Sequence, residues 1–153
     1  MTRRRSWLPA TVSQNPKDMG LLMPTVDAAA DNTAKMPKRV LADAGYKNER
    51  DLTRLEERGI DGYVSLGREG KDVRPPSAAC PRTRAMQKKL ATKRGRARYR
   101  KRKSIVEPVF GWVKGVLGFR AFSLRGLRKV AGEWSLVCLA LNLRRMAAKG
   151  VPL

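Results

Sequence analysis

The chain has 153 residues, a length typical of one domain, and its 34 Lys and Arg residues against 13 Asp and Glu residues give a net charge of +21. It contains no histidine, which excludes histidine-dependent nucleophilic catalysis and histidine metal sites. Cys80 and Cys138 are too few and too far apart for a zinc site or a disulfide framework. No apolar run reaches the ~20 residues of a membrane helix, so we expect a cytoplasmic protein whose partner is a polyanion.

The first half of the sequence predicts a strand–helix–strand unit that follows an initial helix. Asn15 and Pro16 are typical of a helix start, and apolar residues then repeat at helical spacing. Two short apolar strands flank a second helix, and such a unit normally makes neighbouring parallel strands. The predicted elements are a helix over 16–30, a strand over 39–43, a helix over 48–58 and a strand over 62–66.

Glycine and proline predict a loop over 67–81, and three helices follow over about 83–94, 104–117 and 124–148. Two of these helices have an apolar face. The residues expected to face inward are Val106, Val109, Phe110, Val113 and Leu117 on the first, and Leu127, Val130, Trp134, Val137, Cys138 and Leu141 on the second. The predicted fold class is therefore α/β with a helical C-terminal half.

The positive charge is concentrated in one part of the chain. Residues 16–81 hold 11 basic and 11 acidic side chains, whereas residues 82–130 hold 17 basic residues and one acid, Glu107. The cations of such a block repel one another unless phosphates neutralise them, which favours a nucleic-acid contact. The alternative interpretation of the block is a solvated, partly disordered linker. Because Tyr99 and amphipathic helices adjoin the block, we favour contact with nucleic acid.

Two acidic residues are candidates for chemistry. Asp43 ends a strand, where α/β proteins place ligand sites, although a role in the following turn is the simpler interpretation of its position. Glu107 shares a helix face with Gly111 and Lys114. The segment from Ser104 to Glu107 also fits a capping box, and spacing alone does not decide between a cap and a functional site. Two carboxylates among cations are typical of Mg²⁺ chemistry on phosphates.

These residues resemble the DDE transposases of bacterial insertion sequences. VLADAGY, residues 40–46, is similar to the block around the second catalytic Asp of that family, and YRKRKSIVEPVFGWVK, residues 99–114, is similar to its Tyr–Arg–Glu–Lys signature. The matching positions are Tyr99, Arg102, Glu107 and Lys114. Six residues separate Glu107 from Lys114, as in the signature; four instead of three separate Arg102 from Glu107, which makes Lys103 an alternative for the arginine. The C-terminal part of the chain also resembles the end of these transposases, over GFRAFSLRGLRKVAGEWSLVCLALNLRRM, residues 118–146.

The resemblance implies a ribonuclease-H-like fold and metal-dependent cleavage and joining of DNA strands in the bacterial cytoplasm, close to the nucleoid. It assigns Asp43 and Glu107 as catalytic residues that hold Mg²⁺ or Mn²⁺. The residues expected to bind DNA at the ends of the insertion sequence are Lys93, Arg94, Arg96, Arg98, Tyr99, Arg100, Arg102, Lys103 and Lys114. Further partners would be a full-length transposase or the missing N-terminal part of the enzyme.

The first catalytic Asp of the family has no counterpart here, because no acid precedes Asp18. We therefore expect a partial ribonuclease-H-like fold that lacks the first core strands. We therefore expect the C-terminal part of a transposase over residues 15–148, with a basic DNA-contacting segment over 82–103. Residues 1–14 would be an atypical N-terminal segment and residues 149–153 a tail. With one metal ligand absent, the chain alone should have little or no activity.

Two other functions are compatible with the sequence. One is a non-catalytic DNA-binding fragment that occupies transposon ends and inhibits or regulates transposition. The other is a basic RNA-binding protein of the ribosomal kind, which would not need a neutral strand–helix–strand half that carries Asp43.

Overall fold

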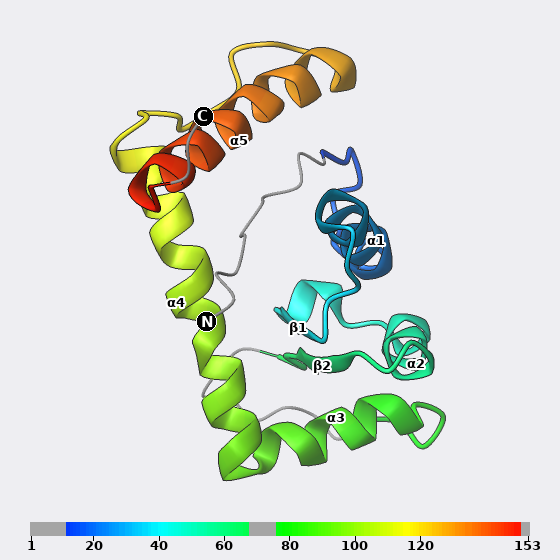
Figure 1. Ribbon diagram of the computed structural model, residues 1–153. Coiled ribbons are helices and arrows are strands. Elements are labelled where there is room, and N and C mark those ends of the chain that lie inside the picture. The colour runs from blue at the N-terminus through cyan, green and yellow to red at the C-terminus, as the bar shows by residue number, and fades with distance from the viewer. Residues whose placement is uncertain (1–11, 68–75, 151–153) are drawn as a thin grey trace.

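The computed structural model describes residues 12–67 and 76–150 of the chain. It is a mixed α/β structure with a small sheet and a majority of helical residues, as expected (Figure 1). In chain order the elements are α1 (Leu22–Thr33), β1 (Arg39–Ala42), the 3-10 turn η1 (Ala44–Tyr46), α2 (Glu49–Glu57), β2 (Asp61–Val64), α3 (Pro81–Ala91), α4 (Lys93–Gly115) and α5 (Leu127–Ala148).

The sheet consists of β1 and β2, which pair in parallel with Arg39 opposite Asp61 and Ala42 opposite Val64. α2 connects them, so the predicted strand–helix–strand unit is confirmed, with each end within two residues of its predicted place. α4 packs along one side of the sheet, and α1 and α2 lie on the other (Figure 1). Among the described residues, no strand pairs with the second edge of β1.

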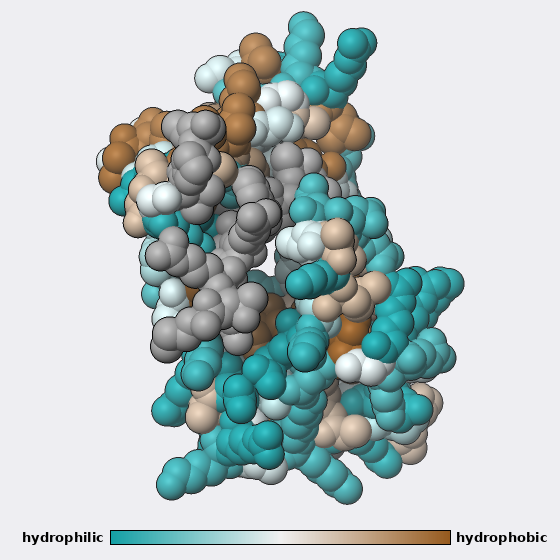
Figure 2. Space-filling view, viewed as in Figure 1, coloured by the Kyte–Doolittle hydropathy of each residue, from teal (hydrophilic) through white to brown (hydrophobic). Residues whose placement is uncertain are grey.

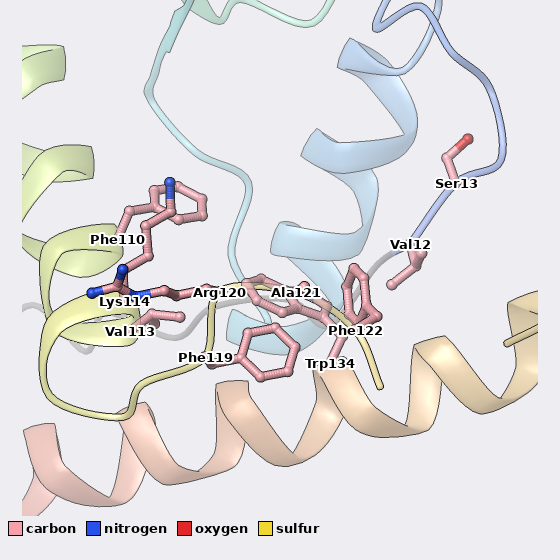
Figure 3. A pocket seen from close by; sticks show the side chains of 10 residues that line it. All are labelled: Val12, Ser13, Phe110, Val113, Lys114, Phe119, Arg120, Ala121, Phe122 and Trp134. Carbon is pink, nitrogen blue, oxygen red and sulfur yellow. The ribbon is translucent and has the colours of Figure 1, made fainter. Parts of the chain in front are cut away.

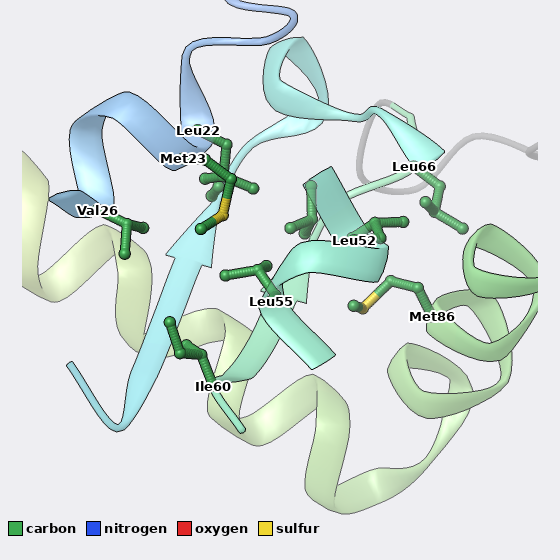
Figure 4. Close-up of a cluster of buried hydrophobic side chains, with 10 residues drawn as sticks. Leu22, Met23, Val26, Leu52, Leu55, Ile60, Leu66 and Met86 are labelled. Carbon is green, nitrogen blue, oxygen red and sulfur yellow. The ribbon is translucent and has the colours of Figure 1, made fainter. Parts of the chain in front are cut away.

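One hydrophobic cluster joins the sheet to α1, α2 and α3 (Figure 4). Every member exposes less than a tenth of its surface, and Val64, at the end of β2, exposes none. Met86 brings α3 into this core. The cluster consists of Leu22, Met23, Val26, Ala42, Leu52, Leu55, Ile60, Val64, Leu66 and Met86.

Two side chains fix α3 on this unit. The carboxylate of Glu49, in the first turn of α2, accepts hydrogen bonds from the backbone amides of Arg82 and Thr83 at 2.7 and 2.9 Å and from the Thr83 hydroxyl at 2.6 Å. It therefore caps the N-terminus of α3 from another helix. At the other end, the Lys89 ammonium donates to Asp61 Oδ1 at 2.7 Å and to the Gly62 carbonyl at 2.8 Å.

Replacing Glu49 by Gln should lower the free energy of unfolding at pH 7 by about 1–2 kcal/mol, because the neutral amide keeps only one acceptor oxygen for three donors. Burial alone would raise the pKa of Glu49, but the hydrogen bonds from Thr83 and Arg82 outweigh burial and lower this pKa. The ionised form therefore stabilises the folded chain above the ordinary pKa of about 4.5, and this contribution is lost as the pH falls through the lowered value.

Urea unfolding from pH 7 down to pH 3 measures this effect, and the difference between wild type and Glu49→Gln should shrink over that range. Glu57→Gln is the matched control, because Glu57 belongs to the same helix, is exposed and caps nothing. A loss of stability of the same size in both variants would contradict the capping role.

The predicted helix start at Pro16 is wrong. Residues 16–20 form bends and turns, and the Asn15 side chain accepts from the Lys17 amide at 3.2 Å in a local turn. Gly20 has a φ of +85°, outside the helical region, and Pro24 occupies the first turn of α1. A helix that ran from Pro16 would set the Pro24 ring against the Gly20 carbonyl, so the helix begins at Leu22.

The predicted helix start at Ser104 is also wrong, and the capping box with it. α4 is continuous over Lys93–Gly115, and its cap is Thr92, whose hydroxyl accepts from the Gly95 amide at 2.9 Å. Ser104 lies in the middle of this helix and donates to the Lys101 carbonyl at 2.9 Å. Glu107 is therefore no capping residue, and the two helices are separated by a single residue, Thr92, instead of by a segment between residues 94 and 104.

α5 packs on the C-terminal part of α4 through Val137, Cys138 and Leu141, which are buried as expected. Leu127 on α5 is exposed, contrary to the prediction, and so are Phe110 and Leu117 on α4. The opposite face of α5 carries a second apolar stripe, made of Leu136, Leu139 and Leu143, with exposed fractions of 68, 52 and 40%.

Within residues 12–67 and 76–150, no helix combines the length and the apolar composition that a membrane span requires. The predicted loop over 67–81 lies largely outside the described residues, as does most of the predicted N-terminal segment.

Candidate functional site

Asp43 directly follows β1 and performs two roles at once. Its Oδ1 accepts a hydrogen bond from the Gly45 amide at 3.2 Å and so caps the short turn η1. Its Oδ2 lies 3.7 Å from Nη1 of Arg102 on α4. The turn role that position alone favours is therefore real, but it uses only one oxygen and leaves the other facing α4.

Arg102 brings the two separated motifs together. It lies 59 positions after Asp43, and its side chain is 26% exposed, against 48% for Asp43. The guanidinium carbon lies 5.7 Å from the centroid of the Tyr99 ring, one turn earlier on α4. The Arg102 Nε is buried and has no hydrogen-bond partner in the described part of the chain, so this guanidinium has unused donor capacity beside a carboxylate.

A second carboxylate, that of Asp18, lies beside the Asp43 turn, and no pattern in the sequence places it there. A Cβ added to Gly45 would lie 2.8 Å from Oδ2 of Asp18 and 3.3 Å from Oδ1 of Asp43. The pKa of Tyr46 in the same turn is raised, first by burial and then by the negative charges of Asp18 and Asp43. The end of β1 is therefore a locally negative spot in a strongly positive chain.

α4 divides the predicted DNA-binding residues between two faces. Tyr99 and Arg102 are half-buried on the inner face, in line with the buried Val109 and Val113. Arg98 is also half-buried. Spacings of three and four residues place an exposed set on the neighbouring face, which we call the outer row of α4. The outer row consists of Lys93, Arg96, Arg100, Lys103, Glu107 and Lys114.

Some cations of the predicted DNA-contacting segment have partners inside the molecule. Arg82 pairs with Glu56 on α2, Lys89 pairs with Asp61, and Arg84 Nε donates to the Pro76 carbonyl at 3.3 Å. The first two contacts hold α3 on the strand–helix–strand unit, and the third joins α3 to the segment that precedes it. The cations of this segment with exposed side chains therefore belong mainly to α4. Figure 2 shows hydrophilic residues over the lower part of the molecule, where α3 and the beginning of α4 lie.

The metal chemistry expected from the sequence finds only a partial set of ligands. Asp43 and Glu107 offer carboxylate oxygens, which suit Mg²⁺ or Mn²⁺. Glu107 is exposed on α4, one and a half turns after Arg102. Residues 12–67 and 76–150 contain no group of three or more Asp, Glu, Cys or His side chains that could hold a metal ion. The donors fit such an ion in kind, but the described set is incomplete.

The fold and this site define a mixed α/β protein in which a strand-end carboxylate lies against a cationic helix. The profile of the transposase DDE domain family matches residues 71–147, about half of the chain, and the chain belongs to this family. The resemblance drawn from the sequence is thereby confirmed. The matched segment contains Tyr99, Arg102, Glu107 and Lys114, whereas Asp43 precedes it. No curated protein and no solved structure matches the chain.

Proposed function

We propose that the chain is the C-terminal part, over residues 15–148, of the catalytic domain of a DDE transposase, and that it binds transposon-end DNA. The observation that carries this proposal is the ion pair between Asp43 and Arg102. It joins the strand-end acid to the helix that the family profile covers, and it does so across 59 positions of sequence. The edge of β1 with which no described strand pairs is where further strands of a ribonuclease-H-like sheet would pair.

In this proposal the cations of the outer row of α4 bind phosphates, and Glu107 lies among them as the one acid. Arg102 holds the Oδ2 of Asp43 until a DNA phosphate competes for the guanidinium, whose buried Nε has no partner in the described residues. Tyr99 keeps Arg102 in place through its ring. Lys114 extends the phosphate path toward α5.

Asp43 and Glu107 would hold the metal ion of the family. A bound Mg²⁺ or Mn²⁺ supplies activation of the attacking oxygen and stabilisation of the leaving oxygen in phosphoryl transfer. We propose that this chain binds DNA, and that cutting the DNA needs, besides Asp43 and Glu107, the carboxylate of the family's first catalytic Asp, which has no counterpart before Asp18. The second candidate function is the regulation of transposition: a chain that occupies transposon ends without this third carboxylate would block them without cutting the DNA.

The metal assignment predicts that Asp43→Asn and Glu107→Gln each weaken Mn²⁺ binding by at least tenfold, since each removes a charged oxygen ligand. The capping-box explanation for Glu107 no longer competes, because Ser104 is internal to α4. Mn²⁺ titration followed by electron paramagnetic resonance, in the presence of a transposon-end duplex, measures the affinity.

Glu57→Gln is the charge-matched control and should leave Mn²⁺ affinity unchanged. Unfolding curves of all three variants should stay close to wild type, because both target carboxylates are at least partly exposed. Equal Mn²⁺ affinity in Glu107→Gln and wild type would remove Glu107 from the site. Strand cleavage by the chain alone would contradict the proposed need for a further carboxylate.

A further inference from the structure

An aromatic pocket lies where α4, the segment after it and α5 meet, and Val12 and Ser13 of the N-terminal segment also line it (Figure 3). Its volume is about 410 Å³. Phe110 comes from α4, Phe119 and Phe122 from the connecting segment, and Trp134 from α5. Helical spacing in the sequence assigns Phe110 and Trp134 to the core and gives no role to Phe119 or Phe122.

The rings form a preassembled cluster. The Phe119 and Phe122 centroids are 5.3 Å apart with planes at 78°, and the Trp134 ring lies 6.3 and 6.4 Å from the two. Phe110 and Phe122 remain 45% and 37% exposed. The pocket therefore offers ring surface that is not used up by packing within the cluster.

The connecting segment is fixed by Glu133 of α5. The Glu133 carboxylate accepts from the Ser123 amide at 2.9 and 3.1 Å and from the Leu124 amide at 3.1 Å. The hydrogen bond from the Ser123 backbone is the main cause of the lowered pKa of Glu133, which keeps this acceptor ionised. The rings of Phe119 and Phe122 are thus held in position before any ligand arrives.

The charge at the pocket selects an anionic ligand. Lys114 and Arg120 line it together with the rings, and no Asp or Glu of the described residues does. Lys114 also belongs to the outer row of α4, so a phosphate backbone that follows this row arrives at the pocket. A volume of about 410 Å³ is at the small end of the ~300–1,000 Å³ range of ligand sites, which suits one base and not a duplex.

We propose that this pocket binds one unpaired nucleotide of the DNA, with its base on the rings of Phe110 and Phe122 and its phosphate on Lys114 and Arg120. This inference rests on the proposed DNA-binding function. Flat bases stack on aromatic side chains with little dependence on sequence, while adjacent cations bind the backbone.

The test compares three DNAs of one duplex sequence: blunt-ended, with a one-thymidine overhang, and with an abasic overhang that keeps the phosphate. The thymidine overhang should bind about tenfold more tightly than the abasic one, because stacking contributes about 1–3 kcal/mol per base. Phe122→Leu should abolish this preference and leave the affinity for the blunt duplex unchanged. Leu136→Ala, on the exposed opposite face of α5, is the control and should keep the preference.

Because Phe122→Leu could fail to fold, Lys114→Gln is a second variant that removes a phosphate contact and leaves all the aromatic rings in place. It should weaken binding of both overhang DNAs by the same factor and so preserve their ratio. Equal affinity of the wild type for thymidine and abasic overhangs overturns the inference. Absence of binding to all three DNAs overturns the proposed function as well, whereas base-independent binding overturns this inference alone.

Discussion

Raising the salt concentration from about 50 to about 200 mM should weaken binding of duplex DNA by about three orders of magnitude. If six phosphates are neutralised, the logarithm of the binding constant falls against the logarithm of the salt concentration with a slope near −5, at about 0.9 per phosphate. α4 alone provides enough cations for this: Lys93, Arg94, Arg96, Arg100, Lys101 and Lys114 are exposed and have no acidic partner among the described residues.

A pair of variants locates these contacts. Replacing Arg96 and Arg100 of the outer row by Gln should flatten the slope by about two units, because two phosphate contacts are lost. The matched control replaces Lys35 and Lys38, two exposed cations between α1 and β1, and removes the same net charge. The control should keep the slope of the wild type.

Fluorescence anisotropy of a labelled duplex across the salt range gives both slopes. A slope near zero in the wild-type chain would exclude nucleic acid as its partner. The same change of slope in both double variants would mean that net charge, and not the outer row of α4, determines binding.

The strand–helix–strand unit could be predicted because its signals are local and agree with one another. Asn48 caps α2 through its side chain, as its place in the sequence indicates, and the apolar runs on both sides form the two paired strands. The helix starts at Pro16 and Ser104 failed for the opposite reason. Each position has a plausible local start signal, but another feature determines where the helix begins. For the first helix this feature is Gly20 with Pro24, and for the second it is the cap at Thr92.

The candidate site could be predicted only as two separate motifs. Nothing in the sequence states that Arg102 rather than another cation of the basic block faces Asp43, because that choice depends on the angle between α4 and the sheet. Asp18 shows the same limit, since its approach to Gly45 depends on a turn that was predicted as helix. The aromatic pocket was not predicted, because helical spacing assigns Phe110 and Trp134 to a core and cannot show that they border an open cavity.

Replacing Gly95 by Ala should cost about 3 kcal/mol or more of folding stability, the largest effect expected for a single methyl group in this chain. A Cβ at this position would lie 1.9 Å from the Lys89 carbonyl oxygen and 3.0 Å from the Thr92 hydroxyl. The carbonyl cannot easily give way, because it accepts hydrogen bonds from the Thr92 hydroxyl at 2.8 Å and the Thr92 amide at 3.3 Å. Its own residue is anchored to β2 through Asp61.

The variant should therefore open the tight junction between α3 and α4 and tilt α4 away from the sheet, so that Arg102 no longer reaches Asp43. Gly111→Ala is the control: it lies in the same helix with open space around the added Cβ and should stabilise the chain by up to about 1 kcal/mol. Thermal unfolding followed by circular dichroism compares the two. Because the outer row of α4 survives in a tilted helix, Gly95→Ala should keep most of its affinity for DNA at low temperature. In the Gly95→Ala background, adding Asp43→Asn should no longer change the affinity for Mn²⁺, because Asp43 no longer lies against α4. A Gly95→Ala chain as stable as the wild type would contradict the close packing of α3 on α4.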